Sequence, residues 1–157
     1  MKEVVIIDYK TGNVDSVFTA IKFLGFNPVL TCDKKIIERA NRIILPGQGS
    51  FDHGMIKINE LGLYDLIKFK ILNEKVPTLG ICLGMHLLAT YGYENNVETK
   101  GLNCIKGKVK KLNVDLNLPH IGWNENYFLT KDNILENIKD GCDFYFAHSY
   151  YFECEEK

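Results

Sequence analysis

Hydrophobic and polar positions follow two patterns in roughly the first ninety residues. Short, nearly continuous apolar runs are typical of strands buried on both faces of a sheet. Between them, apolar residues recur at helical spacing, as in Val14, Val17 and Ile21. The alternation predicts an α/β fold with a mostly parallel sheet and helices on both faces. The predicted strands cover residues 4–8, 28–31, 42–45 and 76–81, and the predicted helices cover residues 14–24, 33–41, 63–72 and 82–91.

The second half of the chain carries a different pattern. Residues 106–112 and 143–152 are strand-like, whereas residues 119–124, which hold the only tryptophan, have the composition of a turn. Asp132 is placed to cap a short helix that runs to residue 139. No repeat, low-complexity segment or linker divides the sequence. We therefore expect a single domain over residues 1–157, with an antiparallel extension of the sheet in its C-terminal half.

Charge and cysteine content narrow the class of protein. The chain has 19 basic and 20 acidic residues, so nothing indicates a nucleic-acid surface or a membrane-binding face. The five cysteines, at positions 32, 82, 104, 142 and 154, are odd in number and form no Cys-x-x-Cys pair. That spacing argues against a disulfide framework and a structural zinc site. These features predict a cytoplasmic protein that needs no metal or organic cofactor.

The most informative stretch is Gly80-Ile-Cys82-Leu-Gly84, which joins the apolar run 76–81 to a helical segment. Its two glycines permit a tight strand-to-helix turn where a Cβ atom would clash. A side chain at the tip of such a turn is exposed, and the following backbone N–H groups point toward whatever binds it. The start of a helix also favours a thiolate. We interpret Cys82 as a nucleophile rather than as a buried structural cysteine.

A second glycine-bearing loop, Pro46-Gly47-Gln48-Gly49-Ser50, follows the strand predicted over 42–45. Ligands of open α/β sheets bind beyond the carboxyl ends of the strands, so both loops should face one crevice. A cysteine that attacks a carbonyl group needs hydrogen-bond donors for the oxyanion that forms. The backbone N–H of Leu83 and one within residues 47–49 are the candidates. Phosphate binding is the alternative, but the loop lacks the Gly-Lys-Ser/Thr ending of a P-loop.

These motifs carry a resemblance to a known family. The chain resembles the class I glutamine amidotransferases, and among them the glutaminase (HisH-type) subunits of imidazole glycerol phosphate synthase in histidine biosynthesis. That family implies a flavodoxin-like, three-layer fold, and the resemblance extends over the whole chain. The matching segments are Asp8-Tyr-x-x-Gly12-Asn13, Pro46-Gly-x-Gly-x-Phe51, Gly80-Ile-Cys-Leu-Gly-Met85, Lys100-Gly-Leu102, Pro119-His-x-Gly-Trp-Asn124 and His148-Ser-Tyr150.

The resemblance implies a role for each matching residue. Cys82 would attack the side-chain amide of L-glutamine, and Gln48 or Gly49 together with Leu83 would form the oxyanion hole. The predicted glutamine-binding residues are Gly49, His86, Glu94, Ser149 and Tyr150. The residues that match positions facing a (β/α)8-barrel cyclase partner, which would receive the ammonia in a heterodimer, are Asn13, Pro119, His120 and Trp123.

Two departures from the family pattern stand out. Relatives usually carry glutamine where this chain has His86, which can still hydrogen-bond a substrate or can be a plain helix-face residue. The family's base and its orienting acid lie in a C-terminal Phe-His-Pro-Glu-type segment that this sequence does not contain. We therefore expect a chain that lacks this C-terminal segment. His148 is the available substitute for the base, although in relatives the His-Ser-Tyr segment binds glutamine instead.

Three alternatives stay open beside a histidine-biosynthetic glutaminase. A similar subunit could supply ammonia for amidine groups on bacterial surface sugars, and His86 is compatible with such divergence. A non-catalytic subunit could dock to the barrel without making ammonia. An unrelated cysteine enzyme of the flavodoxin-like group would lack the partner-facing segments that this sequence carries.

Overall fold

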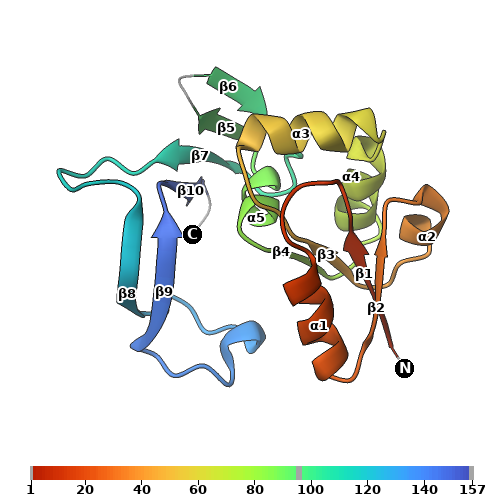
Figure 1. Ribbon diagram of the computed structural model, residues 1–157, viewed down its shortest axis with the longest axis horizontal. Coiled ribbons are helices and arrows are strands. Elements are labelled where there is room, and N and C mark those ends of the chain that lie inside the picture. The colour runs from red at the N-terminus through yellow and green to blue at the C-terminus, as the bar shows by residue number, and fades with distance from the viewer. Residues whose placement is uncertain (1, 95–96, 156–157) are drawn as a thin grey trace. The chain divides into compact units, whose positions relative to one another are not determined.

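The computed structural model describes residues 2–94 and 97–155 (Figure 1). By its internal contacts the chain falls into two compact units. The first unit comprises residues 1–110 and 152–157, and the second comprises residues 111–151. Each unit is described by itself below.

A parallel four-stranded sheet forms the centre of the first unit. Its strands are β1 (Glu3–Ile7), β2 (Asn27–Thr31), β3 (Ile43–Leu45) and β4 (Thr78–Gly80), in the order β2-β1-β3-β4. All three strand pairs are parallel, as the apolar runs predicted. β1 and β3 are almost completely buried, because this position in the sheet covers both their faces. β4 lies at an edge of the described sheet, and its Leu79 is 44% exposed, so this strand is less buried than its apolar sequence predicted.

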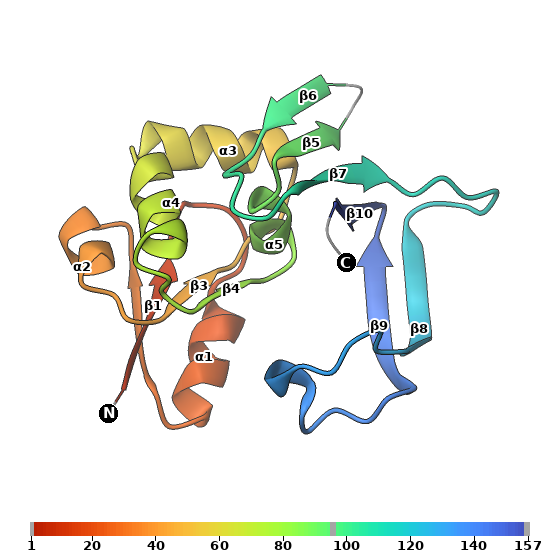
Figure 2. The ribbon, with the colours of Figure 1, turned by 180° about the vertical axis from the view of Figure 1, so that it is seen from behind.

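Helices cover both faces of this sheet, and Figures 1 and 2 show α1 on one side with α3 and α4 on the other. Val4, Ile6 and Ile44 form a buried cluster with Val17, Phe18 and Ile21 of α1. The other helices bury Ile37, Ile58 and Ile67. The helices are α1 (Asp15–Phe23), α2 (Lys34–Glu38), α3 (Phe51–Glu60), α4 (Tyr64–Leu72) and α5 (Leu83–Leu87).

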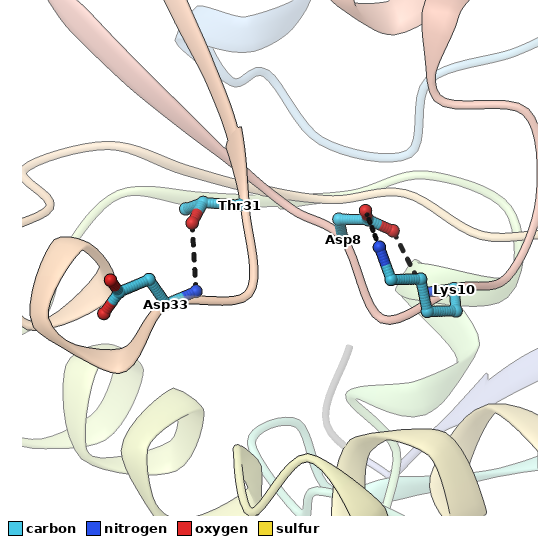
Figure 3. Close-up of polar contacts among 4 residues, drawn as sticks. All are labelled: Asp8, Lys10, Thr31 and Asp33. Carbon is cyan, nitrogen blue, oxygen red and sulfur yellow. Dashed lines mark hydrogen bonds and ion pairs between the residues drawn. The ribbon is translucent and has the colours of Figure 1, made fainter.

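Polar turns close the ends of β1 and β2 (Figure 3). The backbone N–H of Asp8 donates to the carbonyl oxygen of Thr31 over 3.0 Å, which extends the pairing of the two strands by one residue. Thr31 Oγ1 then accepts from the N–H of Asp33 at 2.9 Å, and Asp33 Oδ1 caps α2 by accepting from Lys35 at 2.8 Å. In the loop after β1, Lys10 Nζ lies 2.6 Å from Asp8 Oδ2. The helix predicted over residues 33–41 is present, but it ends at Glu38 and is shorter than expected.

A second sheet joins β5 (Tyr91–Glu94), β6 (Val97–Lys100), β7 (Gly107–Lys111) and β10 (Tyr150–Cys154), in the order β10-β7-β5-β6. The helix predicted to continue to residue 91 is wrong, because α5 ends at Leu87 and Tyr91 already belongs to a strand. The carbonyl groups of Leu87, Leu88 and Ala89 accept hydrogen bonds from the backbone of residues 102–105. These long-range bonds satisfy the helix end and turn the chain into β5.

The second unit is built on an antiparallel pair of strands, β8 (His120–Asn126) and β9 (Cys142–His148). The turn predicted over residues 119–124 is therefore wrong, since all but Pro119 lie in β8. The strand predicted over 143–152 is divided at Ser149 into β9 and β10. Asp132 accepts from the N–H of Ile134 at 2.9 Å and caps a single 3-10 turn, η1 (Asn133–Leu135). The predicted cap is correct, but the helix it begins is much shorter than expected.

Candidate active site

Three loops leave the carboxyl ends of neighbouring parallel strands in the first unit. Residues 8–13 follow β1, residues 46–50 follow β3, and residues 81–82 follow β4. Because β1, β3 and β4 are adjacent and parallel, these loops meet at the same edge of the sheet. This is the edge at which open α/β sheets bind their ligands.

Cys82 occupies a strained turn between β4 and α5. Its φ of 52° and ψ of −117° lie in a region that side chains rarely adopt. Its carbonyl oxygen accepts from the N–H groups of Met85 and His86, at 3.0 and 3.2 Å, so the first turn of α5 holds the residue in place. The Cys82 side chain is exposed. The strained and exposed position is that of a displayed nucleophile, and it differs from the buried state of most free cysteines.

The two glycines beside Cys82 are required by close backbone packing. A Cβ atom at Gly80 would lie 2.5 Å from the Cα of Met85. A Cβ atom at Gly84 would lie 1.7 Å from the carbonyl oxygen of Leu45, at the end of β3. Neither backbone neighbour can move without displacing a strand or a helix. The sharp turn that displays Cys82 thus depends on glycine at both positions.

The loop after β1 packs against the loop after β3. A Cβ atom at Gly47 would lie 1.9 Å from the hydroxyl oxygen of Tyr9, and one at Gly12 would lie 2.7 Å from the backbone nitrogen of Gln48. Gly12 has a φ of +88°, which only glycine adopts without strain. The β1 loop therefore supports the backbone of the glycine-rich loop at two successive residues.

Tyr9 and Thr11 bring two buried hydroxyl groups to this support. Both side chains are buried, and neither hydroxyl has a hydrogen bond of ordinary geometry. Burial raises the pKa of the Tyr9 phenol to about 12; proximity to Thr11 lowers this pKa somewhat, and the nearby Cys82 raises it further. The phenol consequently stays protonated at any physiological pH. Buried hydroxyls without a well-formed hydrogen bond are rare in folded proteins, and here they lie in the loop that supports the glycine-rich loop.

The candidate oxyanion donors belong to two segments, the start of α5 and the loop after β3. Leu83 is the first residue of α5, and its side chain is buried, so its backbone is fixed in the core. Gln48 and Gly49 are exposed, and Gly49 has a φ of +109° with open space on the side where a Cβ atom would point. The β3 loop thus offers accessible peptide groups, whereas Leu83 offers a rigid one. Which of these N–H groups serves an oxyanion stays a prediction.

Glu94, at the end of β5, is next to the start of α3. Burial raises the pKa of its carboxyl group, the backbone N–H of Phe51 lowers it, and Asp52 raises it again. Gly92, also in β5, packs closely against the Phe51 ring, since a Cβ atom at Gly92 would lie 2.4 Å from that ring. This contact holds β5 beside the start of α3. The structure therefore places Glu94 beside the residue that follows the glycine-rich loop. This position is compatible with the predicted contact to a substrate amino group.

Two further predicted residues have well-defined places in the first unit. His86 lies in α5, one turn after Cys82, and is half-buried. The side chain of Asn13 accepts from the N–H of Asp15 at 3.1 Å, at the start of α1. The side-chain bond expected of an N-terminal cap is present, although the residue directly before the helix is Val14. Asn13 itself is exposed, as a partner-facing residue would be.

In the second unit, His120 and His148 face each other across β8 and β9. His120 Nδ1 lies 3.2 Å from His148 Nε2, and His148 Nδ1 donates to the carbonyl oxygen of Tyr150 at 2.8 Å. His120 Nε2 lies 2.9 Å from the side-chain oxygen of Asn124. Both ring nitrogens of His148 are thus engaged inside this unit.

The remaining predicted residues of the second unit lie at its surface or in its turn. Pro119 is exposed, and Trp123 is 70% exposed and makes an edge-to-face contact with Tyr145 at 5.5 Å between ring centroids. Ser149, between β9 and β10, accepts from the N–H of Leu112 at 2.9 Å. The structure therefore brings His120, Trp123, Ser149 and Tyr150 together in one unit, and Cys82, Gln48, His86 and Glu94 in the other.

Comparison with known proteins agrees with this geometry. Residues 5–157 match the family model described as glutamine amidotransferase class-I. The chain belongs to this family. It is 44% identical over 156 residues to the imidazole glycerol phosphate synthase subunit HisH 2 of Methanococcus maripaludis, and it covers 76% of that protein. It is 42% identical to HisH 1 of Campylobacter jejuni, of which it covers 77%, and 42% identical to HisH of Aquifex aeolicus, of which it covers 70%. These alignments include 98%, 98% and 93% of the present chain.

Solved structures share the same fold. A crystal structure titled glutamine amidotransferase superposes with a TM-score of 0.71 at 19% identity, covering 98% of this chain and 75% of that one. A glutamine amidotransferase from Thermotoga maritima superposes with a TM-score of 0.65 at 17% identity, covering 99% of this chain and 64% of that one. Both support the predicted class I amidotransferase fold. Among the residues that the structure describes, no helix is long and apolar enough to cross a membrane.

Sequence reasoning did not single out Tyr9 and Thr11 as parts of the site. The available signal was position, because both residues follow β1 directly, at the same sheet edge as the loops after β3 and β4. Their burial and their unpaired hydroxyls depend on how three loops pack together. Such packing is not visible in a local sequence pattern.

Proposed function

We propose that the chain is the glutaminase subunit of an imidazole glycerol phosphate synthase. It hydrolyses L-glutamine to L-glutamate and ammonia, and the ammonia passes to a cyclase subunit of the (β/α)8-barrel class in a cytoplasmic heterodimer. The cyclase uses it to convert a ribonucleotide-derived substrate into imidazole glycerol phosphate. The observation that carries the proposal is the exposed Cys82 at a φ of 52°, held between two obligatory glycines in a chain of the class-I family.

The chemistry proceeds through a thioester on Cys82. The thiolate sulfur attacks the side-chain carbonyl carbon of glutamine and forms a carbon–sulfur bond, while the carbonyl oxygen becomes an oxyanion. The backbone N–H of Leu83 and that of Gln48 or Gly49 donate to this oxyanion. The carbon–nitrogen bond then breaks, and the amide nitrogen leaves as ammonia after taking up a proton. Water adds to the thioester, which releases glutamate and restores the thiol.

The glutamine substrate is held by groups at its other end. The carboxylate of Glu94 pairs with the substrate ammonium, and the accessible peptide of Gly49 lies along the side chain that reacts. His86 supplies a hydrogen-bonding ring where relatives have an amide. By the family resemblance alone, Ser149 and Tyr150 are further glutamine contacts, to the backbone atoms of the substrate.

The residues that contact the barrel subunit are Asn13 of the first unit and, in the second unit, Pro119, His120 and Trp123. The 70% exposure of Trp123 supports this assignment, because exposed tryptophans are enriched at protein interfaces. Hydrolysis also needs a base that accepts the thiol proton. His148 fits that role poorly, since Tyr150 and His120 occupy its two nitrogens. In the class I family this base belongs to a Phe-His-Pro-Glu-type segment, which residues 1–157 do not include.

The proposal is tested by reconstitution with the barrel cyclase encoded by the same organism. Imidazole glycerol phosphate formation is measured with either L-glutamine or ammonium chloride as the nitrogen source. We expect both sources to support the reaction, and Cys82→Ser to abolish only the glutamine-dependent rate. Cys154→Ser, which alters another exposed cysteine, is the matched control and should leave both rates unchanged. If the unaltered pair formed product from ammonium chloride but not from L-glutamine, the proposal would be refuted.

A further inference from the structure

A continuous chain of hydrogen-bonding groups runs through the second unit. It begins at the side-chain amide of Asn124, passes through His120 and His148, and ends at the carbonyl oxygen of Tyr150. Its three contacts measure 2.9, 3.2 and 2.8 Å. It therefore connects β8, which carries the proposed docking residues His120 and Trp123, to Tyr150 at the start of β10.

The direction of these hydrogen bonds follows from the chemistry of their ends. A carbonyl oxygen can only accept, so His148 donates to Tyr150 through Nδ1. In a neutral ring the other nitrogen is then an acceptor, and His148 Nε2 receives a proton from His120 Nδ1. His120 Nε2 is then an acceptor, whereas the Asn124 atom 2.9 Å from it is the side-chain oxygen, so this direction requires the Asn124 amide turned by 180°, with its NH2 group donating to His120 Nε2.

The two imidazole rings are also fixed by aromatic packing. The His120 ring stacks on Phe146 with 5.3 Å between centroids, and His148 lies 5.6 Å from the same phenylalanine. The antiparallel register places His120 directly opposite His148, with Phe146 two pairs further along, opposite Gly122. A ring held by packing and by bonds at both nitrogens has little rotational freedom.

We propose that His148, oriented by His120, is a positioning residue that holds the Ser149–Tyr150 backbone in the conformation that binds glutamine. On one side the N–H of Leu112 donates to the carbonyl of Ser149, and on the other His148 donates to the carbonyl of Tyr150. These bonds fix two successive peptide groups at the break between β9 and β10. The inference rests on the proposed function, because it takes Ser149 and Tyr150 as glutamine contacts.

The role of His148 can be tested with two isosteric replacements. The amide nitrogen of asparagine takes roughly the place of Nδ1, whereas that of glutamine takes roughly the place of Nε2. Binding of L-glutamine is measured by calorimetry in the complex with the barrel subunit, with Cys82→Ser present so that the ligand is not consumed. We expect His148→Gln to weaken glutamine binding about tenfold, as for the loss of one hydrogen bond, and His148→Asn to stay within about threefold. His53→Gln, at an exposed histidine of α3, is the control.

The outcomes separate this inference from the proposed function. Equal glutamine affinity in the His148→Gln and His148→Asn proteins would overturn the positioning role and leave the glutaminase proposal intact. In the protein with Cys82 present, an equal and large loss of kcat in both variants, with unchanged glutamine affinity, would make His148 a base and overturn the inference. An absence of glutamine binding by the starting Cys82→Ser complex would overturn both.

A spectroscopic measurement tests the pair without any ligand. An N–H···N hydrogen bond between His120 and His148 gives a through-bond coupling between the two ring nitrogens in ¹⁵N NMR. We expect this coupling in the unaltered chain and its loss in His120→Ala. Its absence from a folded, unaltered chain would show that the two rings are not joined and would overturn the proposal.

Discussion

The Cα atom of Gly84 rests on the carbonyl oxygen of Leu45, so closely that a Cβ atom at Gly84 would lie 1.7 Å from that oxygen. The same oxygen accepts the N–H of Ile81 at 3.0 Å, which continues the pairing of β3 with β4. One carbonyl group therefore anchors both the strand before Cys82 and the helix after it. The display of the nucleophile depends on this contact.

Gly84→Ala is accordingly expected to damage both stability and activity. Its methyl group must push α5 away from β3, at a cost of about 3 kcal/mol in the free energy of unfolding. Urea unfolding measures the loss, and glutamate release measures the displacement of Cys82. Gly54→Ala is the matched control, because its Cβ atom would meet only side-chain atoms of Leu83 and Leu87 at 3.1 Å or more. Equal stability of the two variants would contradict the proposed contact.

Two replacements of Cys82 should distinguish the backbone strain at this residue from its role as a nucleophile. At a φ of 52° and ψ of −117°, any side chain is strained, whereas glycine is not. Cys82→Gly is therefore expected to be about 1 kcal/mol more stable than Cys82→Ala, with both variants inactive as glutaminases. Thermal unfolding of the two proteins provides the comparison. A less stable glycine variant would mean that the turn is unstrained.

Removal of the Tyr9 hydroxyl should stabilise the protein. This buried hydroxyl has no hydrogen-bond partner, so Tyr9→Phe is expected to raise the free energy of unfolding by about 1 kcal/mol at neutral pH. Tyr64→Phe is the control with the opposite expectation, because Tyr64 donates to the carbonyl of Gly101 at 3.2 Å. Chemical denaturation at pH 8 distinguishes the two, and a destabilised Tyr9→Phe protein would show that the hydroxyl is paired in solution.

The advantage of Tyr9→Phe should grow at alkaline pH. The pKa of Tyr9 is about 12 in the folded protein and about 10 in an unfolded chain, so between these values the unfolded state binds fewer protons. Stability contributed by this group is complete below pH 10 and is lost as the pH rises toward 12, by about 1.4 kcal/mol per pH unit. The difference between wild type and Tyr9→Phe should thus widen from pH 9 to pH 11. If the difference in the free energy of unfolding stayed constant from pH 9 to pH 11, the Tyr9 phenol would be exposed to water and its pKa would not be raised.

Glu94 should make glutamine binding sensitive to mild acid. Burial raises the pKa of this carboxyl group, so it loses its charge at a higher pH than an exposed glutamate does. Pairing with the substrate ammonium needs the charged form, and KM for glutamine should rise as the pH falls toward that raised value. Glu94→Gln should raise KM at neutral pH and remove this dependence. Glu98→Gln, in the neighbouring strand β6, is the control.

The parallel sheet and the Cys82 turn could be predicted from the sequence because their causes are local. Continuous apolar runs of strand length gave β1 to β4 in the correct order along the chain, and glycines 80 and 84 flank the turn that the structure contains. The capping roles of Asp33 and Asp132 are equally local, because each side chain bonds an N–H two residues further on.

The helix α3 (Phe51–Glu60) was not predicted, and the other features that sequence reasoning missed depend on distant partners. β8 contains Gly122 and follows Pro119, both typical of turns, and it is a strand because β9 pairs with it over its full length. The end of α5 at Leu87 is set by hydrogen bonds from residues 102–105. The hydrogen-bonded pair of His120 and His148 depends on the register of β8 and β9, which no local pattern contains.

The central claim is that Cys82 is the nucleophile that hydrolyses glutamine. The most direct measurement is intact-protein mass spectrometry of the chain with its barrel partner, quenched in acid during turnover of L-glutamine. We predict a glutamyl thioester on Cys82 that is absent from the Cys82→Ser protein and present in Cys154→Ser. Glutamate release without a Cys82 adduct, and undiminished in Cys82→Ser, would contradict the account.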